Sequence, residues 1–150
     1  MPTTSGSTGP RSDSGETGPR VLVVDDSYIN REACSSLLSQ WGIEPVLACD
    51  GAQALELVRE HRFDLVLMDI RMPVMDGLAA TEQIRRFEQE QARRPSVPVV
   101  AYSSDDVPPD IARKVGLSGM LRKPSDAASL GEILRTWCAD KLPKRREAPG

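Results

Sequence analysis

The sequence predicts an α/β fold with a doubly wound, five-stranded parallel sheet, a (βα)5 arrangement that carries helices on both faces. Five short apolar runs alternate with five amphipathic stretches along the chain. Because parallel strands are joined by long crossover connections, this strict alternation indicates helices between parallel strands. The first, third and fourth runs are continuously apolar, which is typical of strands that are buried on both sides.

The first half of the pattern predicts three strands and two helices. The strands are expected at residues 21–24, 43–48 and 63–69. After the first strand, apolar residues at three- and four-residue spacing predict a helix that Gly42 closes: Ala33, Leu37, Leu38 and Trp41. Residues 52–60 predict the second helix, with Leu55 and Val58 facing inward.

The second half predicts two strands and three helices. The strands are expected at residues 97–102 and 118–122, and the third helix at residues 77 to about 91. A short helix follows a pair of prolines, which suit a first helical turn, and we expect its Ile111 and Val115 to be buried. The last helix carries one apolar stripe, made of Leu130, Ile133, Leu134, Trp137 and Cys138.

The composition indicates one globular domain. The chain has 150 residues, of which 39% are hydrophobic and 27% charged, so it can bury a core and differs from disordered chains. Aromatic residues make up only 4%, so we expect an aliphatic core. The net charge of −3 disfavours nucleic acid or an anionic membrane as the main partner, because both attract basic surfaces.

The sequence predicts a cytoplasmic protein. Its apolar runs fall short of the roughly 20 residues that a transmembrane helix needs. The residues after Met1 lack the basic and apolar parts of a signal peptide. The three cysteines, Cys34, Cys49 and Cys138, are far apart and form no Cys-x-x-Cys pair. We therefore expect reduced packing residues and neither a disulfide nor a zinc framework.

The two ends of the chain differ in composition from its middle. Residues 1–19 contain 15 Gly, Pro, Ser or Thr residues, which predicts a flexible tether. Residues 140–150 combine four basic residues with two prolines, and we expect a solvated tail there in preference to a binding patch. The predicted packed domain spans residues 20–139.

Polar residues with complementary chemistry stand at the ends of the predicted strands. Asp25 and Asp26 follow the first strand, Asp69 ends the third, Ser103 follows the fourth and Lys123 follows the fifth. The carboxyl ends of parallel strands meet at one sheet edge, where sites in such sheets lie. Clustered carboxylates repel one another, by about 4 kcal/mol per pair at about 4 Å with an effective dielectric of about 20. They need a cation, and oxygen ligands favour a hard ion such as Mg²⁺ over zinc.

Each of these residues also has a simpler explanation when taken alone. An acidic pair after a strand often caps the next helix, a Lys–Pro pair commonly forms a turn, and Asp69 could be an ordinary loop residue. Their joint occurrence at four strand ends favours a site. The single histidine, His61, ends the second predicted helix near the opposite edge, so we do not expect histidine-based catalysis.

Four segments of the chain form a recognisable set: residues 21–26 (VLVVDD), 69–77 (DIRMPVMDG), 99–103 (VVAYS) and 123–124 (KP). Together they resemble the response-regulator receiver domains of two-component signalling, and the second segment is highly specific for that family. The resemblance covers about residues 20–139. It implies a flavodoxin-like sheet with the strand order 2-1-3-4-5.

The resemblance implies a phosphoacceptor site. Asp69 would be the nucleophile that takes a phosphoryl group from a phosphohistidine and forms an acyl phosphate. Asp26 would bind Mg²⁺ directly and Asp25 mainly through water, with Asp69 and the backbone carbonyl of Arg71 completing the protein ligands. Phosphoryl transfer depends on positioning and charge neutralisation, which Mg²⁺ and Lys123 supply.

Other residues have implied supporting roles. Lys123 would pair with the phosphoryl oxygens, and Ser103 would hydrogen-bond one of them after transfer, so that phosphorylation changes the loop geometry. Pro124 would hold the turn that aims Lys123, with the cis peptide bond of the family. We also expect Arg71 and Asp105 to overhang the site as an ion pair that hinders the attacking water.

The chain departs from the family at Met120. Many receivers have an aromatic ring three residues before the strand-end lysine, whereas a flexible methionine lacks the rigid two-position character of a ring. We therefore expect a monomer with weak coupling to distant faces. Its partners would be a histidine kinase or a histidine phosphotransfer domain, docking near the first helix and the strand-end loops. No nucleic acid or membrane contact is expected.

Three other function classes fit the sequence less well. A haloacid-dehalogenase-type phosphatase carries Asp-x-Asp after its first strand, whereas Asp25 and Asp26 are adjacent. A dinucleotide-binding domain needs a glycine-rich turn at that place. A receiver-like module that binds partners without phosphorylation normally lacks an acidic, hydroxyl or lysine position, and none is missing here.

Two biological contexts remain open. Residues 72–77 and the long loop at residues 89–96 resemble the receivers of hybrid histidine kinases, and we favour that origin. The alternative is a stand-alone, single-domain response regulator. We expect a module that assists its own phosphorylation and dephosphorylation and is not an enzyme in its own right, although a hybrid parent would be a histidine kinase.

Overall fold

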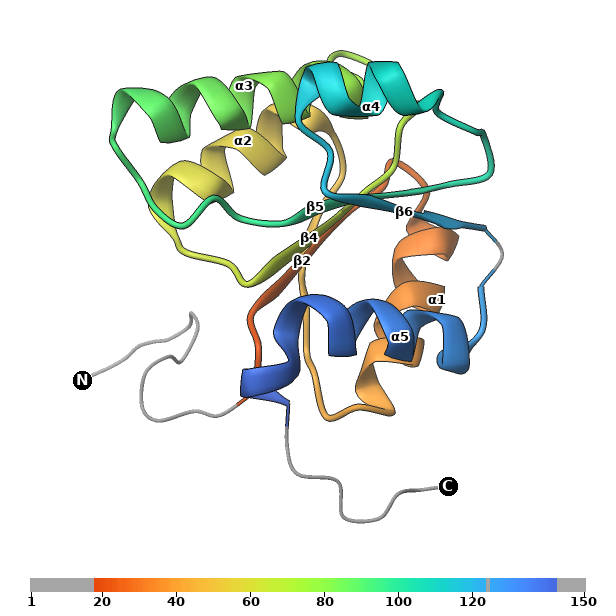
Figure 1. Cartoon of the computed structure of the whole chain (residues 1–150). Coiled ribbons are helices and arrows are strands. Elements are labelled where there is room, and N and C mark those ends of the chain that lie inside the picture. Colours follow the sequence, from red (N-terminus) through yellow and green to blue (C-terminus); the bar gives the residue numbers. More distant parts are fainter. Residues whose placement is uncertain (1–17, 124, 143–150) are drawn as a thin grey trace, which may run out of the picture.

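A five-stranded sheet lies between two layers of helices in the computed structural model, which describes residues 18–123 and 125–142 (Figure 1). The strands are β2 (Val21–Val24), β3 (Val46–Ala48), β4 (Leu65–Met68), β5 (Val99–Ser103) and β6 (Gly119–Arg122). Their spatial order is β3-β2-β4-β5-β6, and all four neighbouring pairs are parallel. Counted along the chain this order is 2-1-3-4-5, so the predicted fold class and topology are confirmed.

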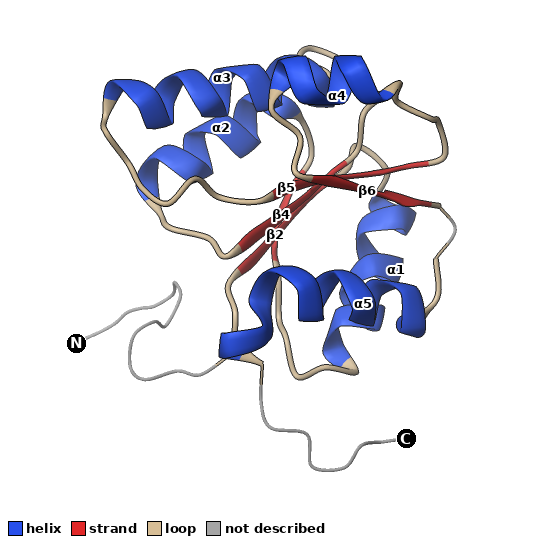
Figure 2. Ribbon diagram, in the orientation of Figure 1, coloured by secondary structure: helices blue, strands red, loops and turns tan. Residues whose placement is uncertain are grey.

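The helices alternate with the strands, as the sequence pattern predicts. They are α1 (Tyr28–Ser39), α2 (Gly51–Glu60), α3 (Gly77–Glu90), α4 (Pro109–Val115) and α5 (Ala127–Cys138), and the 3-10 turn η1 (Ala139–Lys141) follows α5. Helices α2, α3 and α4 lie on one side of the sheet, and α1 and α5 lie on the other (Figure 2). Helices therefore cover both faces of the sheet, and the ends of the central strands stay uncovered.

Alternating side chains of the strands form two large apolar clusters, and a smaller third one contains Ile70, Ala101 and Val107. Leu22 and Val24 of β2 belong to the cluster that α2 and α3 cover, together with Ala54 and Ile84. Val21 and Val23 point the other way, into the cluster that α1 and α5 cover. All four residues of β2 are buried. Burial on both faces explains why this strand reads as an uninterrupted apolar run.

Side-chain caps begin four of the helices. The capping oxygens belong to Ser27, Asp50, Asp76 and Asp126, and each accepts a hydrogen bond from the amide three residues later, at 2.8–3.2 Å. Helix α4 begins instead at a proline, without a side-chain cap. Caps satisfy amides that the first helical turn leaves unpaired, so these polar residues fix where each helix leaves the strand-end edge.

Two strand starts differ from the predicted ones next to proline residues. The second strand begins at Val46 and not at residue 43, and the fourth begins at Val99 and not at residue 97. Pro45 and Pro98 precede these starts, and proline has no amide hydrogen to donate to a parallel neighbour. The third strand is limited to residues 65–68, and the fourth extends to Ser103.

Several predicted positions of apolar side chains were wrong. Ile111 is 39% exposed, whereas Val115 is buried, so α4 contacts the core through one face of only two turns. In α1 the inward residues are Cys34 and Leu38, and Ala33 is exposed. Trp137 is 36% exposed although it continues the α5 stripe.

The cysteines are free, and two of the three pack in the core. Cys34 and Cys138 are buried, whereas Cys49 is exposed and is not a packing residue. Burial raises the pKa of the Cys34 thiol to about 12 and has the same effect on Cys138. Both buried thiols are therefore neutral at physiological pH.

Packing in the described chain extends from Pro19, which is buried, to Leu142, which packs against the α1–α5 cluster. Most of the predicted tether and basic tail lies outside the described residues. Asp64 contacts residues near both ends of the described chain. Its carboxylate accepts a hydrogen bond from the Arg20 amide at 2.8 Å and lies 3.5 Å from Lys141 Nζ. No helix of the described chain is long and apolar enough to cross a membrane.

Candidate phosphoacceptor site

The backbone ladder of the sheet brings the predicted site residues to one edge. The Asp25 amide donates to Ala48 O at 3.1 Å, and the Asp69 amide donates to Val24 O at 2.9 Å. On the far side, the Lys123 amide donates to Ser103 O at 2.9 Å. These bonds continue the parallel register just past the strand ends. The polar residues that follow the apolar runs therefore converge, as the sequence predicts.

Three carboxylates and one ammonium group form the centre of the site. Oxygens of Asp25, Asp26 and Asp69 lie within 4.8 Å of one another. Lys123 Nζ donates to Asp25 Oδ2 and lies 3.8 Å from Asp69 Oδ2. Asp25 is also held from the helix side, because its Oδ1 accepts from the Ser27 amide at 2.9 Å. A single lysine leaves the cluster with an excess of negative charge.

Asp69 has the most perturbed carboxylate of the cluster. Its residue is 8% exposed. Burial raises the pKa of the Asp69 carboxyl to about 6, the neighbouring Asp25 charge adds to the rise, and Lys123 opposes it. Such a shift in a partly buried acid at a sheet edge is typical of functional sites.

The loop from β5 to α4 is held over the site by two ion pairs. Asp105 Oδ2 lies 2.7 Å from Arg71 Nε, as predicted for a pair across the mouth. Asp106 Oδ1 lies 2.6 Å from Arg122 Nη1. Ser103 Oγ, which is buried, accepts a hydrogen bond from the Asp105 amide at 3.2 Å. Among residues 18–123 and 125–142, Ser103 Oγ donates to no acceptor, so its hydroxyl can bond a new one.

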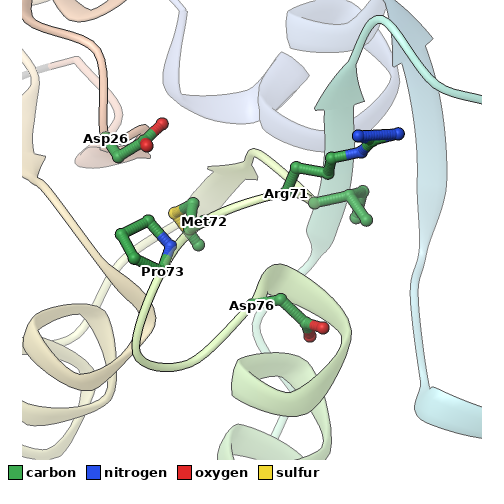
Figure 3. A pocket seen from close by; sticks show the side chains of 6 residues that line it. Asp26, Arg71, Met72, Pro73 and Asp76 are labelled. Atoms are coloured by element: carbon green, nitrogen blue, oxygen red, sulfur yellow. The ribbon is translucent and has the colours of Figure 1, made fainter.

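An open depression of about 420 Å³ lies beside the carboxylates (Figure 3). It is lined by Asp26, Ile70, Arg71, Met72, Pro73 and Asp76. Asp26 faces this depression from the side opposite Arg71 and Asp76 (Figure 3). Its size and openness suit a small charged group that arrives from outside better than a deeply enclosed substrate.

Gly77 allows α3 to start directly against the acceptor residue. A Cβ atom at this position would lie 2.1 Å from the Asp69 carbonyl oxygen and 2.9 Å from Ile70 Cα. The Gly77 amide donates to Ile70 O at 2.8 Å. The glycine of the DIRMPVMDG segment is therefore required by a close approach of two backbones.

The donor set of the cluster fits Mg²⁺. It consists of carboxylate oxygens only, and Asp26 is exposed to the depression. Hard oxygen ligands with room for water are what Mg²⁺ prefers. We expect Asp25, Asp26 and Asp69 to hold the ion, with the Arg71 carbonyl as the predicted fourth protein ligand.

A family model for the response regulator receiver domain matches residues 21–135. The chain belongs to this family. The match starts at the first residue of β2 and ends within α5, so it includes all four strand ends that carry site residues.

Known receivers resemble this chain in sequence and in structure. The osmosensing histidine protein kinase SLN1 of Saccharomyces cerevisiae is 35% identical over 133 residues, which are 85% of this chain and 11% of that protein. The receiver domain of the sensor histidine kinase PA1611 from Pseudomonas aeruginosa PAO1, with a magnesium ion in its active site cleft, is 35% identical. Its TM-score is 0.70, with 80% of this chain and 97% of that chain covered.

A further similar structure is a receiver with its partner. A chain in the co-crystal structure of the Saccharomyces cerevisiae histidine phosphotransfer signaling protein Ypd1 and the receiver domain of the response regulator Ssk1 is 30% identical. Its TM-score is 0.73, with 85% of this chain and 94% of that chain covered. In contrast, the chain spans only 11–17% of the first curated relatives that it matches.

The structure places most of the predicted site residues and adds one that sequence reasoning missed. Met120 lies on β6 in register with Ala101 and is 40% exposed. Pro124, with its predicted cis peptide bond, lies outside the described residues. The missed residue is Arg31 of α1, whose Nη1 donates to the Asp25 carbonyl at 2.8 Å. Its position four residues after the Ser27 cap, on the strand-facing side of the first turn, is the signal that could have found it.

Proposed function

We propose that this chain is the phosphoacceptor module of a two-component phosphorelay, with Asp69 accepting a phosphoryl group from a phosphohistidine in the presence of Mg²⁺. The observation that carries the proposal is the meeting of three carboxylates and one lysine beside the open depression that Asp26 lines. Membership of the receiver family supports it.

Each residue has a definite task in the proposed transfer. An Asp69 oxygen attacks the phosphorus atom, the P–N bond breaks as the O–P bond forms, and the electron pair of the broken bond stays on the imidazole nitrogen. Bound Mg²⁺ supplies charge neutralisation for the phosphoryl oxygens. The Lys123 ammonium starts 3.8 Å from Asp69 Oδ2 and pairs with a phosphoryl oxygen after transfer. Ser103 donates its hydroxyl proton to another.

The acceptor assignment is tested with a small phosphodonor. Acetyl phosphate and Mg²⁺ should raise the intact mass by one phosphoryl group, and Asp69→Asn should abolish the gain. Asp50→Asn is a matched control, because Asp50 follows β3 at the same edge but caps α2 through the Gln53 amide at 2.8 Å. A phosphoryl group that persists in Asp69→Asn would show that another residue is the acceptor. A chain that is not phosphorylated at all would favour the alternative of a binding module.

We propose further that a phosphohistidine-bearing partner docks on α1 and the β4–α3 loop. The most exposed large apolar side chains of the described chain are Val74 at 86%, Ile29 at 75% and Tyr28 at 66%. Tyr28 and Ile29 form the first turn of α1, directly after the acidic pair, and Val74 lies in the loop after Asp69. A donor histidine that reaches Asp69 must pass these residues, and apolar groups of this kind anchor interfaces.

Docking and chemistry can be separated by comparing two phosphodonors. Ile29→Ser should slow transfer from a phosphorylated histidine phosphotransfer protein about tenfold or more and leave phosphorylation by acetyl phosphate unchanged. Ile111→Ser is the control, because Ile111 is exposed on α4, away from the proposed surface. Equal slowing by the two variants would contradict docking on α1.

We propose a hybrid histidine kinase as the parent protein and the cytoplasm as the location. The first curated relatives are sensor kinases, of which this chain matches one segment, whereas similarity to a transcriptional regulatory protein keeps a response regulator as the alternative. In this view the chain assists its own phosphorylation and dephosphorylation and is no enzyme by itself. Phosphotransfer profiling against the purified histidine kinases and phosphotransfer domains of the source organism would identify the partner.

A further inference from the structure

Arg31 ties the first helix back to the strand end that carries the acidic pair. Its Nη1 donates to the Asp25 carbonyl oxygen at 2.8 Å. Its own amide donates to Ser27 O at 3.0 Å, in the first turn of α1. The guanidinium carbon lies 5.9 Å from the centre of the Tyr28 ring. The side chain therefore closes the β2–α1 connection from the helix side.

The Arg31 hydrogen bond is made to the peptide group that joins Asp25 to Asp26. A peptide unit is planar, so a hydrogen bond to the Asp25 carbonyl also fixes the orientation of the Asp26 amide and Cα. Asp25 has further restraints, since its amide donates to Ala48 O, and its carboxylate accepts from the Ser27 amide at 2.9 Å and from Lys123 Nζ. Within residues 18–123 and 125–142, the Asp26 carboxylate takes part in no hydrogen bond or ion pair between protein groups. Its direction depends on the backbone that Arg31 holds.

We propose that Arg31 is a positioning residue for the metal site. It holds the Asp25–Asp26 peptide so that the Asp26 carboxylate stays aimed at Asp69, within the 4.8 Å cluster. The proposal rests on the function proposed above, because it concerns the ion that this acidic cluster holds. Arg31 itself is not one of the predicted metal ligands.

Two effects of Arg31 on Mg²⁺ binding have opposite signs. As a positive charge near the cluster, Arg31 opposes binding of a cation, so its removal alone would tighten Mg²⁺ binding. As a positioning residue it preorganises Asp26, so its removal would weaken Mg²⁺ binding. Residues that orient metal ligands typically contribute about 10–100-fold to metal affinity. Arg31 acts through the backbone, so we expect the lower end of this range.

A Mg²⁺ titration of the full chain by calorimetry separates these effects. Arg31→Met keeps the aliphatic stem and removes the donor, and we expect about tenfold weaker binding. Arg31→Lys keeps the charge and one donor group, and it should restore affinity to within about threefold of the wild type. Arg135→Met is the matched control, because Arg135 lies over the Trp41 ring at 5.6 Å on α5, away from the site. The Mg²⁺ affinity of the Arg135→Met variant should equal that of the wild type.

Phosphorylation kinetics give a second readout. With acetyl phosphate, Arg31→Met should need about tenfold more Mg²⁺ for half-maximal rate and reach the wild-type maximal rate at saturating Mg²⁺. A general structural defect would lower the maximal rate as well. Unfolding by urea in the presence of a chelator checks that each variant is folded.

The outcomes distinguish this inference from the proposed function. Unchanged or tighter Mg²⁺ binding by a folded Arg31→Met protein overturns the positioning role, even where the wild type is phosphorylated normally. If Arg31→Met does not fold, failure of Arg31→Lys to retain affinity overturns it. If Arg31→Met binds Mg²⁺ more weakly but the wild type is not phosphorylated, the positioning role stands and the phosphoacceptor function fails.

Discussion

At the scale of single residues, Asp69 is the place where burial and function oppose each other. A buried carboxylate next to Asp25 favours its protonated form, which explains the pKa of about 6. The proposed nucleophile must be ionised, so in the proposed transfer Mg²⁺ and Lys123 would offset this cost. The pKa of Asp69 is therefore set by its surroundings and not by the intrinsic chemistry of a carboxyl group.

The raised pKa of Asp69 predicts a pH-dependent effect on stability. The folded chain binds this proton more tightly than the unfolded chain, so the stabilising contribution is present below about pH 4 and is lost as the pH rises through about 6. In a chelator, Asp69→Asn should raise the free energy of unfolding at about pH 7.5 by about 1–3 kcal/mol. The gain should shrink towards about pH 4. Urea denaturation at both pH values measures it.

Asp126→Asn is the control for this pH effect. Hydrogen bonds from Ser129 lower the pKa of the exposed Asp126 carboxyl, so the sign of its contribution is reversed. This variant should gain no stability at neutral pH. An Asp69→Asn protein that is less stable than the wild type at neutral pH would contradict the desolvation argument.

Asp25 and Asp26 should differ in their effect on metal affinity. Asp25 is buried and paired with Lys123, whereas Asp26 is exposed to the depression. We expect Asp26→Asn to weaken Mg²⁺ binding more than Asp25→Asn, because Lys123 already neutralises much of the Asp25 charge, whereas the exposed Asp26 carboxylate is free to bind the ion. Calorimetric titration of both variants measures the difference, and equal losses would contradict an inner-shell role of Asp26 alone.

The Arg71–Asp105 pair should influence the lifetime of the acyl phosphate. The two side chains are 2.7 Å apart and largely exposed. Exposed pairs contribute only about 0–1 kcal/mol, so Asp105→Ala should change the dephosphorylation rate by less than about tenfold. Phosphorylation itself should not change. Decay of the intact-mass signal after removal of the phosphodonor measures the rate, and an identical decay would remove the pair from the mechanism.

At the scale of elements, a buried ionic network joins α3 to the opposite edge of the sheet. Arg85 donates to Gly116 O at 3.0 Å, to Val97 O at 2.7 Å and to Glu88 at 2.9 Å. Glu88 is 4% exposed and accepts from the Val97 amide at 2.8 Å. The network fixes the C-terminal end of α4, whereas the loop before α4 is held by exposed ion pairs and by the buried Val107.

This network predicts a large loss of stability for Arg85→Met. The substitution leaves Glu88 as a buried charge without its partner, which costs about 3–5 kcal/mol in comparable sites. The free energy of unfolding, measured with urea at neutral pH, should fall by about that amount. Arg86→Met is the control on the exposed side of α3 and should change it by less than about 0.5 kcal/mol. Similar losses in both variants would contradict the buried network.

At the scale of the whole molecule, the two ends of the strands carry different kinds of residues. One edge carries the acceptor residues and the exposed Tyr28, Ile29 and Val74. The other edge receives both ends of the described chain near Asp64 (Figure 1). The two ends of the described chain therefore lie at the opposite ends of the strands from Asp25, Asp26 and Asp69.

We expect the chain to remain monomeric before and after activation. Met120 has no rigid ring to report movement of Ser103, and the large apolar groups on α4, β6 and α5 are each only 36–40% exposed. Scattered partly exposed apolar residues are normal on monomers. Sedimentation with and without beryllofluoride, a phosphoryl mimic, measures the oligomeric state. Dimers that form only on activation would show that this face is coupled to the site despite Met120.

The local sequence patterns determined the fold class and which strand-end residues meet, and the resemblance to receiver domains implied the strand order. Apolar runs, helical spacing and strand-end polar residues are local patterns, and parallel topology brings every strand end to one edge. This is why Asp25, Asp69 and Lys123 could be predicted to meet although Lys123 lies far from both in the chain. Proline positions, which the same local patterns contain, explain the shifted starts of β3 and β5.

Only the tertiary structure decided how the elements are rotated and how closely they approach. The exposure of Ile111 depends on the rotation of a two-turn helix about its axis, which sparse apolar spacing does not specify. The Arg31–Asp25 contact depends on the angle at which α1 leaves β2. The approach of Trp41 to Gly131, where a Cβ atom would lie 2.3 Å from the indole, joins segments about 90 residues apart. Such contacts arise from the packing of whole faces, and local sequence patterns contain no record of which side chains meet across them.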